Sequence, residues 1–391
     1  MPDSLFCRLS ASVGKRAMLA LVVCAVVIVW DLAHRGLPTP MARAVLPLIS
    51  ADFSQPPQRK GQGSIPMPYN TPAAHSSSLL ALPASHADAL MAFWFAGTRE
   101  SAPDIGIVAS SFERNLQRWR PARFVVNRFG LGQDLGFGVR RLGNPVAWMD
   151  AQGRMHLFVV ATGLGGWAAS RIVQLRQNRA GQSLDELSFE VERVLPLSWW
   201  WNTSFLVRAA PLPLQDGGML LPVYFELGLK YPVSLRFDAS GGFKGMVRMS
   251  DRKRILQPTV LMQTETTWLA LMRDQNPQGH IAVAQTQDGG AHWQDLPDLA
   301  LVNPDASVAA MALAPGQLWL VHNSSVQSRN VLDLSQSQDG QSWQSMQRLA
   351  QGKGTDEFSY PAMAWADDSL WVSYTDQRQR ISWQRFAWPK P

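Results

Sequence analysis

Short apolar runs alternate with polar turns along most of the chain, from about residue 77 to the C-terminus. Segments such as LWLV at 318–321 and LWVSY at 370–374 have the pattern of short strands. Long stretches with helical periodicity are absent from this part of the chain. The hydrophobic pattern therefore predicts an all-β fold.

One unit recurs six times, and it consists of an apolar strand, a polar turn and a second apolar strand. The copies begin roughly 45 to 70 residues apart, which is the length of a four-stranded propeller blade with its loops. The six hairpins are predicted at Ser78–Phe95, Pro145–Val160, Pro211–Phe225, Pro258–Met272, Ala309–Val321 and Pro361–Tyr374. We therefore predict a six-bladed β-propeller over residues 77–391.

Two turns between third and fourth strands share a pattern of Ser/Thr, Asp, Gly and Trp. They are Thr286–Trp293 (TQDGGAHW) and Ser337–Trp343 (SQDGQSW), and Ser111–Trp119 resembles an eroded third copy. In such a turn the Asp carboxylate accepts backbone N–H groups, Gly adopts a positive φ, and Trp packs beneath. We call these segments Asp-turns and expect them to mark the structural face of the propeller.

The last unit has only three strands, and an open ring would leave an exposed edge. The apolar stretch Val45–Phe53, within a linker predicted over residues 36–76, is expected to supply the missing strand. This strand would join the two ends of the chain and close the ring.

The N-terminal 35 residues have the organisation of an export segment, a hydrophobic helix with basic residues before it. Arg8, Lys15 and Arg16 precede the apolar run Ala17–Trp30, which ends at Asp31. The pattern predicts a signal anchor in the inner membrane with the propeller in the periplasm, or a cleaved signal peptide and a secreted domain. Both cysteines lie in this segment, so the remainder can form neither a disulfide nor a cysteine metal site.

Composition narrows the choice of partners. The 16 Trp residues suit strand packing or stacking on sugar-like ligands. The net charge of +6 is spread over scattered basic residues, whereas a nucleic-acid binder usually carries a concentrated basic stripe. We therefore expect an acidic small substrate or a membrane surface as partner, no nucleic acid, no cofactor, no metal and a monomeric protein.

Strand direction alternates within a blade, so the positions opposite the Asp-turns can be deduced. They lie before first strands, after second strands and before third strands. This rim is rich in Arg, carboxylate, Tyr and amide side chains: Arg99, Glu100, Asp104, Asn144, Arg171, Arg208, Glu226, Tyr231, Gln257, Arg273, His280, Asn303, Asn323, Arg329, Tyr360, Asp376 and Arg378. Several arginines at one rim together with acids and tyrosines favour an anion-binding pocket.

Residues 75–388 resemble the sialidase (neuraminidase) superfamily, and in particular its predicted-neuraminidase branch with a BNR-type domain. The resemblance rests on the Asp-turns, on WFAGTRE at 94–100 and on QPT at 257–259, LMR at 271–273, SRN at 328–330 and SYP at 359–361. It implies a six-bladed propeller that removes terminal sialic acids with retention. The family uses a tyrosine nucleophile helped by a glutamate, an aspartic acid/base and three arginines that clamp the substrate carboxylate.

Carried onto this sequence, the resemblance implies Tyr360 as nucleophile, Asp104 as acid/base, and Arg273 and Arg329 as two clamp arginines. The family glutamate is replaced by Gln257, which cannot accept the tyrosine proton. Glu226 is the candidate substitute.

The first clamp arginine has no counterpart near Ser76–Ser78, and Arg99 is the candidate replacement. The residues expected to bind substrate are Arg99, Glu100, Asn144, Gln257, Arg273, Asn303, Asn323, Arg329 and Tyr374. The alternative is a non-catalytic, membrane-tethered propeller that binds glycans or partner proteins in envelope polysaccharide handling.

Overall fold

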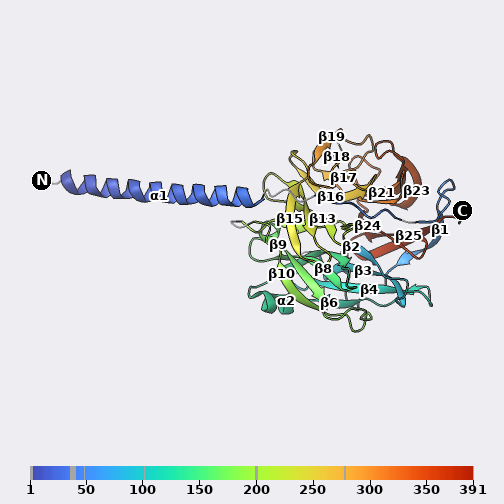
Figure 1. The fold of residues 1–391 in the computed structure, drawn as a ribbon. Helices are drawn as coiled ribbons and strands as arrows, with labels where there is room; N and C mark the ends of the chain where they lie inside the picture. Colours follow the sequence, from blue (N-terminus) through green and yellow to red (C-terminus); the bar gives the residue numbers. More distant parts are fainter. Residues whose placement is uncertain are drawn as a thin grey trace.

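Six antiparallel sheets form the body of the protein in the computed structural model, which describes residues 3–35, 41–47, 49–100, 102–198, 201–276 and 279–390. Successive sheets contact one another in a ring, mostly through their first strands, so each sheet is one blade of a propeller (Figure 1). The prediction of a six-bladed β-propeller is confirmed, and all six predicted hairpins are present.

The blades are numbered in chain order. Blade 1 contains β2 (Ala73–Ala81), β3 (Asp88–Gly97), β4 (Gly106–Glu113), β5 (Arg118–Trp119) and β6 (Arg123–Val126). Blade 2 contains β7 (Arg141–Met149), β8 (Met155–Thr162), β9 (Ser170–Gln177) and β10 (Phe189–Val194). Blade 3 contains β11 (Phe205–Val207), β12 (Leu212–Pro213), β13 (Met219–Phe225), β14 (Tyr231–Phe237) and β15 (Phe243–Arg248).

The remaining three blades follow the same order. Blade 4 contains β16 (Ile255–Met262), β17 (Trp268–Asp274), β18 (Ile281–Thr286) and β19 (Gln294–Leu296). Blade 5 contains β20 (Ala309–Ala314), β21 (Gln317–His322), β22 (Val331–Ser337) and β23 (Gln344–Gln351). Blade 6 contains β24 (Phe358–Ala366), β25 (Ser369–Asp376), β26 (Arg380–Ala387) and, on its outer edge, β1 (Gln58–Ser64).

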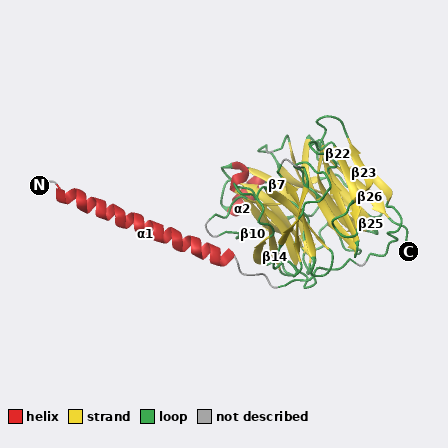
Figure 2. Ribbon diagram, turned by 90° about the horizontal axis from the view of Figure 1, so that it is seen from above, coloured by secondary structure: helices red, strands yellow, loops and turns green. Residues whose placement is uncertain are grey.

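Two short helices lie among the strands. The helix α2 (Arg128–Leu135) follows blade 1, and Asn127 caps it by accepting hydrogen bonds from the backbone N–H groups of Phe129 and Gly130. The 3-10 helix η1 (Gly166–Ala169) connects β8 to β9. Neither helix interrupts the ring of sheets (Figure 2).

Large aromatic side chains fill the spaces within and between the blades. Trp94, Trp268, Trp319 and Trp371 lie in second strands and are at most 1% exposed. Replacing such a residue by Ala typically costs about 3–5 kcal/mol. The Trp content of the sequence therefore serves core packing in these four blades.

The strand that closes the ring is β1, not the predicted Val45–Phe53. The β1 strand pairs antiparallel with β26 from Gln58–Ala387 to Ser64–Ser382, near the C-terminus (Figure 1). This strand lies within residues 36–76, the predicted linker, but it is made of other residues than those predicted. The propeller therefore draws on residues well before position 77.

The segment from Ala42 to Phe53 instead lies over the Asp-turn face. Ala44 forms a β-bridge with Leu214 of blade 3, and Phe53 packs edge-on against Trp388 with ring centroids 5.2 Å apart. Val45 and Pro47 line a largely apolar cavity of about 250 Å³ together with first-strand residues of blades 3 to 6. This segment thus covers the Asp-turn end of the central channel, and the predicted rim lies at the other end.

The N-terminal helix α1 (Asp3–Arg35) extends away from the propeller (Figure 1). The large apolar side chains from Met18 to Trp30 are mostly more than half exposed. Across the described ranges, no helix combines the length and the apolar character needed to cross a membrane.

Candidate functional site

An equivalent bulge interrupts the first strand of four blades at the rim. In each case the register skips two residues, and the first of the two has a positive φ: Ser76 (58°), Asn144 (43°), Gln257 (48°) and Tyr360 (53°). Proline follows at three of these bulges, where its missing N–H is tolerated. The repeated bulge re-aims one side chain per blade, as bulges beside active sites commonly do.

Tyr360 is the residue around which three other blades converge. The His75 ring of blade 1 lies 4.3 Å from the Tyr360 ring, measured between centroids. The guanidinium carbons of Arg208 from blade 3 and Arg329 from blade 5 lie 5.2 and 5.9 Å from the centroid of the tyrosine ring. The half-buried Tyr360 side chain therefore projects toward the channel axis.

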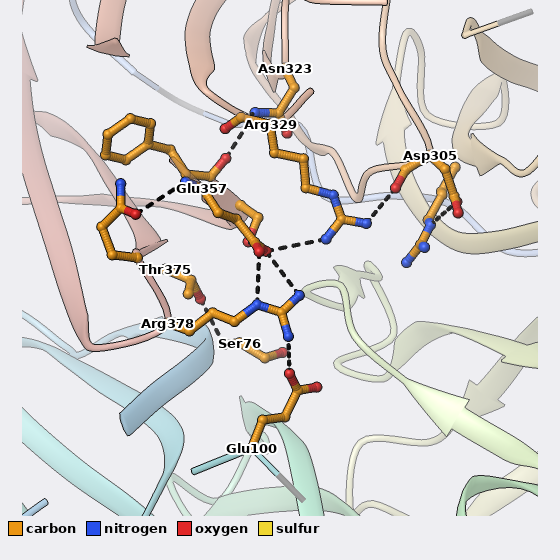
Figure 3. Close-up of polar contacts among 12 residues, drawn as sticks. Ser76, Glu100, Asp305, Asn323, Arg329, Glu357, Thr375 and Arg378 are labelled. Atoms are coloured by element: carbon orange, nitrogen blue, oxygen red, sulfur yellow. Dashed lines mark hydrogen bonds and ion pairs between the residues drawn. The ribbon is translucent and has the colours of Figure 1, made fainter. Parts of the chain in front are cut away.

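A carboxylate bridges two arginines beside Tyr360 (Figure 3). Glu357 accepts hydrogen bonds from Arg329 Nη1 at 3.2 Å, from Arg378 Nε at 2.7 Å and Nη2 at 3.3 Å, and from Ser359 Oγ at 2.6 Å. Arg378 also donates to Glu100. Burial alone would raise the pKa of Glu357, but the hydrogen bonds from Arg378 and Ser359 and the charges of Arg378 and Arg329 lower it to about 2.

Arg273 of blade 4 also pairs with a carboxylate. It donates through Nε to Asp305 and through Nη1 to Gln257 Oε1 at 3.1 Å. Burial opposes the charge on Arg273, but the bond to Asp305 outweighs it and raises the pKa of the guanidinium. Gln257 Nε2 in turn lies 3.4 Å from the Tyr224 hydroxyl. The amide thus bridges an arginine and a tyrosine.

Arg208 differs from the other three arginines because it has no carboxylate partner among the residues that the structure describes. It is 3% exposed and reaches across the channel to the carbonyl oxygens of Ser77 in blade 1 and Pro361 in blade 6, at 3.3 and 2.7 Å. Burial lowers the pKa of Arg208 to about 10, so the guanidinium stays charged at neutral pH. A buried cation therefore lies beneath Tyr360.

Family comparison gives these groups a context. A family model described as a BNR repeat-like domain matches residues 88–372, which includes blades 2 to 5 in full and parts of blades 1 and 6. The chain belongs to the BNR repeat-like domain family. No curated protein matches it.

Solved structures place the BNR repeat-like propeller beside sialidases in fold. A Hadza microbial sialidase superposes with a TM-score of 0.63 at 16% identity over 80% of this chain and 65% of its own. Trypanosoma rangeli sialidase superposes with a TM-score of 0.63 at 12% identity, over 87% of this chain and 60% of its own. The chain thus spans less than two thirds of either sialidase.

A third structure, a protein of unknown function from Dyadobacter fermentans, superposes with a TM-score of 0.68 at 12% identity, over 85% of this chain and 99% of its own. At these identities the similarity shows the fold. The likeness covers at least 80% of this chain in all three cases.

Five residues singled out from the sequence come together at this rim of the BNR repeat-like propeller: Glu100, Gln257, Arg273, Arg329 and Tyr360. Glu226 lies nearby, within electrostatic range of Tyr224, Arg273 and Asp305. Burial raises the pKa of Glu226, whereas Lys230 and Arg273 oppose the rise. These charged and polar side chains therefore form one cluster at the rim that strand direction predicts.

Other predicted residues have different surroundings. The exposed Asp104 carboxylate accepts hydrogen bonds from the backbone N–H and hydroxyl of Thr98, both at 2.9 Å, in the loop between β3 and β4. Arg99, in the same loop, is exposed. Asn144 is 8% exposed at its bulge. Their proposed roles as acid/base and substrate ligands stay predictions.

Three predicted substrate ligands are buried and make contacts within the protein. Asn303 donates to the Pro304 and Ala306 carbonyls, and Asn323 donates to three backbone carbonyls that include Phe358. Both amides are fully buried and tie loops together. Tyr374 lies in the hydrophobic core between blades 5 and 6, where Gln384 approaches its hydroxyl at 3.4 Å. Tyr374 therefore lies on the side of β25 that faces the core, and its role as a substrate ligand stays a prediction.

The sequence interpretation missed four central residues of the cluster. Arg208 and Arg378 were placed on the rim without a role, whereas Glu357 and His75 were not singled out. Arg378 lines a small cavity with His75 and Glu100 at the start of blade 1, which is where the first clamp arginine was expected. Among the described residues, no group of three His, Cys, Asp or Glu side chains has the arrangement of a metal site.

Proposed function

We propose that this BNR repeat-like propeller is a glycoside hydrolase of exo-sialidase type that acts on a terminal sialic or related acidic sugar. The observation that carries the proposal is the position of Tyr360, whose half-buried ring projects from a bulge toward the channel axis. Arginines of blades 3 and 5 and Arg378 of its own blade surround this ring. Cationic surroundings favour both a developing phenolate and an anionic sugar. A tyrosine is suited to attack an anomeric carbon that already bears a carboxylate.

In the proposed mechanism, the Tyr360 hydroxyl oxygen attacks the anomeric carbon as the bond to the leaving oxygen breaks. Asp104 protonates that oxygen, and Glu226 is the proposed acceptor of the tyrosine proton. Its raised pKa suits a carboxylate that exchanges protons closer to neutral pH. Water then releases the sugar from Tyr360 with overall retention.

The proposed clamp consists of Arg273, Arg329 and Arg378. Arg378 replaces Arg99 in this role, because it adjoins His75 and Glu100 at the start of blade 1. Three guanidinium groups from blades 4, 5 and 6 would surround one carboxylate. Bidentate hydrogen bonding by arginine favours planar anions of this kind.

Hydrolysis of a fluorogenic sialoside by the full chain tests the proposal, with Tyr360→Phe as the decisive variant. Loss of a nucleophile that acts as one unit with its partners is expected to lower kcat by about 10³-fold or more. Tyr374→Phe is the matched control, since this tyrosine lies in the core away from the rim. Retained turnover in Tyr360→Phe, or no turnover by the wild type on a panel of acidic glycosides, contradicts the proposal.

A second candidate is a non-catalytic propeller that binds glycans or partner proteins in envelope polysaccharide handling. Gln257 favours it, because an amide at this position cannot accept a proton. Glycan binding that survives in both Tyr360→Phe and Asp104→Asn, without turnover in the wild type, would support this function over hydrolysis.

We also propose that the propeller is exported and monomeric, either tethered to the inner membrane by α1 or secreted after cleavage. The motivation is the basic flank before the apolar run Ala17–Trp30. Protease digestion of cells with the outer membrane opened, and of fully lysed cells, tests the location. A propeller that is digested only after the inner membrane is broken would refute export.

A further inference from the structure

Glu357 occupies the Arg329–Arg378 pair in the way that the carboxylate of an acidic ligand would. Three guanidinium N–H groups and the Ser359 hydroxyl donate to its two oxygens (Figure 3). The Glu357 side chain is 18% exposed, so it is held at the wall of the pocket and still touches solvent. The protein thus supplies its own anion to two arms of the proposed clamp.

Glu357 is an anion at neutral pH, since its pKa is lowered to about 2. Protonation therefore does not release the two arginines near neutral pH. A ligand carboxylate has to compete with a charged group that is already tethered beside them. Tethering gives such an internal competitor a high effective concentration.

The other arginines of the cluster have different partners from the Arg329–Arg378 pair. Arg273 is paired with Asp305, and Arg378 has Glu100 as a second partner, whereas Arg208 donates only to backbone carbonyls in the described part of the chain. Of these carboxylates, Glu357 alone bridges two arginines. Its position therefore decides whether that pair attracts an external anion.

We propose that Glu357 is a specificity-determining residue that sets how strongly the pocket discriminates between carboxylated and uncharged sugars, because a ligand carboxylate binds to Arg329 and Arg378 only by displacing it. The proposal deepens the proposed function and rests on it for the sugar class. Displacement requires only a rotation of the Glu357 side chain toward solvent. No proton or covalent bond is exchanged.

Binding of two probes of nearly the same shape tests this role. N-acetylneuraminic acid carries the carboxylate, and its methyl ester lacks the charge. Calorimetry on the full-length wild type and on Glu357→Gln compares the two affinities. The variant is expected to bind the acid about 10-fold or more tightly than the wild type does, since charge-assisted bonds become available, and to leave ester binding within about twofold.

Two further variants make the result independent of one substitution. Ser359→Ala removes a single hydrogen bond to Glu357 and keeps the ion pairs, so it is expected to raise acid affinity by a smaller factor. Glu190→Gln breaks an Arg–Glu pair at an exposed position of the outer strand β10 and is expected to change neither affinity. If Glu357→Gln is found unfolded by thermal melting, the Ser359→Ala series carries the test.

Equal acid affinity in the wild type and both rim variants would overturn the proposal, as would a parallel rise for acid and ester. Failure of every variant to bind either probe also overturns it. Because binding is measured without turnover, absence of hydrolysis refutes the proposed reaction and leaves this result intact. Conversely, turnover with unchanged discrimination refutes only the role of Glu357.

Discussion

Acid is expected to destabilise the propeller through His75, and the effect can be worked out from its surroundings. The imidazole is 3% exposed and packs between Tyr360 and Phe95, with ring centroids 4.3 and 5.3 Å away. Burial, followed by the charges of Arg378, Arg208 and Arg329, lowers the pKa of His75 from 6.5 to about 3, although Glu357 opposes the shift. The folded protein therefore keeps this ring neutral where the unfolded chain protonates it.

The sign and size follow from proton linkage. Above pH 6.5 neither state binds the proton, so the full stability is present. Between pH 6.5 and 3 only the unfolded state binds it, so stability is lost as the pH falls. At pH 5 the loss from His75 is roughly 1.36 × (6.5 − 5.0), or about 2 kcal/mol. Burial also lowers the pKa of His156 and His322, so they add to the loss in the same direction.

Urea unfolding of the wild type and of His75→Asn at pH 7 and pH 5 measures this contribution. The variant is less stable at pH 7, but its loss between the two pH values is expected to be smaller than that of the wild type by about 2 kcal/mol. Phe95→Leu, which disturbs the same packing and keeps the imidazole, should lose as much as the wild type. Equal losses in the wild type and His75→Asn would refute the reasoning.

Two substitutions elsewhere probe the rim and the structural face. Gln257→Glu places a carboxylate between Tyr224 and Arg273, where the resemblance expects a proton acceptor, and is expected to raise kcat on a sialoside by about 10-fold or more. An unchanged or lower kcat in Gln257→Glu contradicts a role of position 257 as proton acceptor. Asp339→Ala removes acceptors for two backbone N–H groups at 2.8 Å in an Asp-turn and should lower the free energy of unfolding by about 1–2 kcal/mol. The neighbouring exposed Gln338→Ala should be neutral, and equal effects would show that the carboxylate has no special role.

The blade pattern was predictable because it depends on local chemistry repeated six times. Each hairpin shows as two apolar runs around a polar turn, and the Asp-turns have a recognisable order of residues. In Thr286–Trp293, for example, Asp288 accepts the backbone N–H of His292 at 2.9 Å and the Thr286 hydroxyl at 2.8 Å. Such interactions span few residues and leave a direct mark on the sequence.

The closing strand could not be identified in this way, because its environment reverses the usual signal. Gln58–Ser64 lies on an edge and is almost entirely exposed, so it needs no apolar side chains to pair with β26. Ile49, Ala51 and Phe53 are apolar because they pack against the core of blades 5 and 6. The hydrophobic pattern of these two segments indicates which one packs on the core, but it does not indicate which one pairs as a strand.

Arg378 was missed for a related reason. It lies with Gln377 in the turn between β25 and β26, and both residues have a φ of 56°, although neither is Gly or Asn. The sequence Asp-Gln-Arg-Gln at 376–379 carries none of the usual signals for such a turn. The partner Glu357 lies 21 residues away and in another loop, so the ion pair is visible only once blade 6 has folded.

The strained backbone of the rim links these observations to function. Ser76, Asn144, Gln257, Tyr360 and Arg378 all have positive φ, which costs a residue with a side chain on the order of 1–3 kcal/mol. Glycine at these positions would remove the strain, but it would also remove each side chain from the channel mouth. Positive φ also occurs in turns of the opposite face, such as at Asp367 and Asp368, but there it belongs to hairpin turns. A bulge repeated at the same place in four first strands is expected where side chains must be held for a ligand. The bulges therefore favour a binding or catalytic rim over a purely structural one, independently of the family to which the chain belongs.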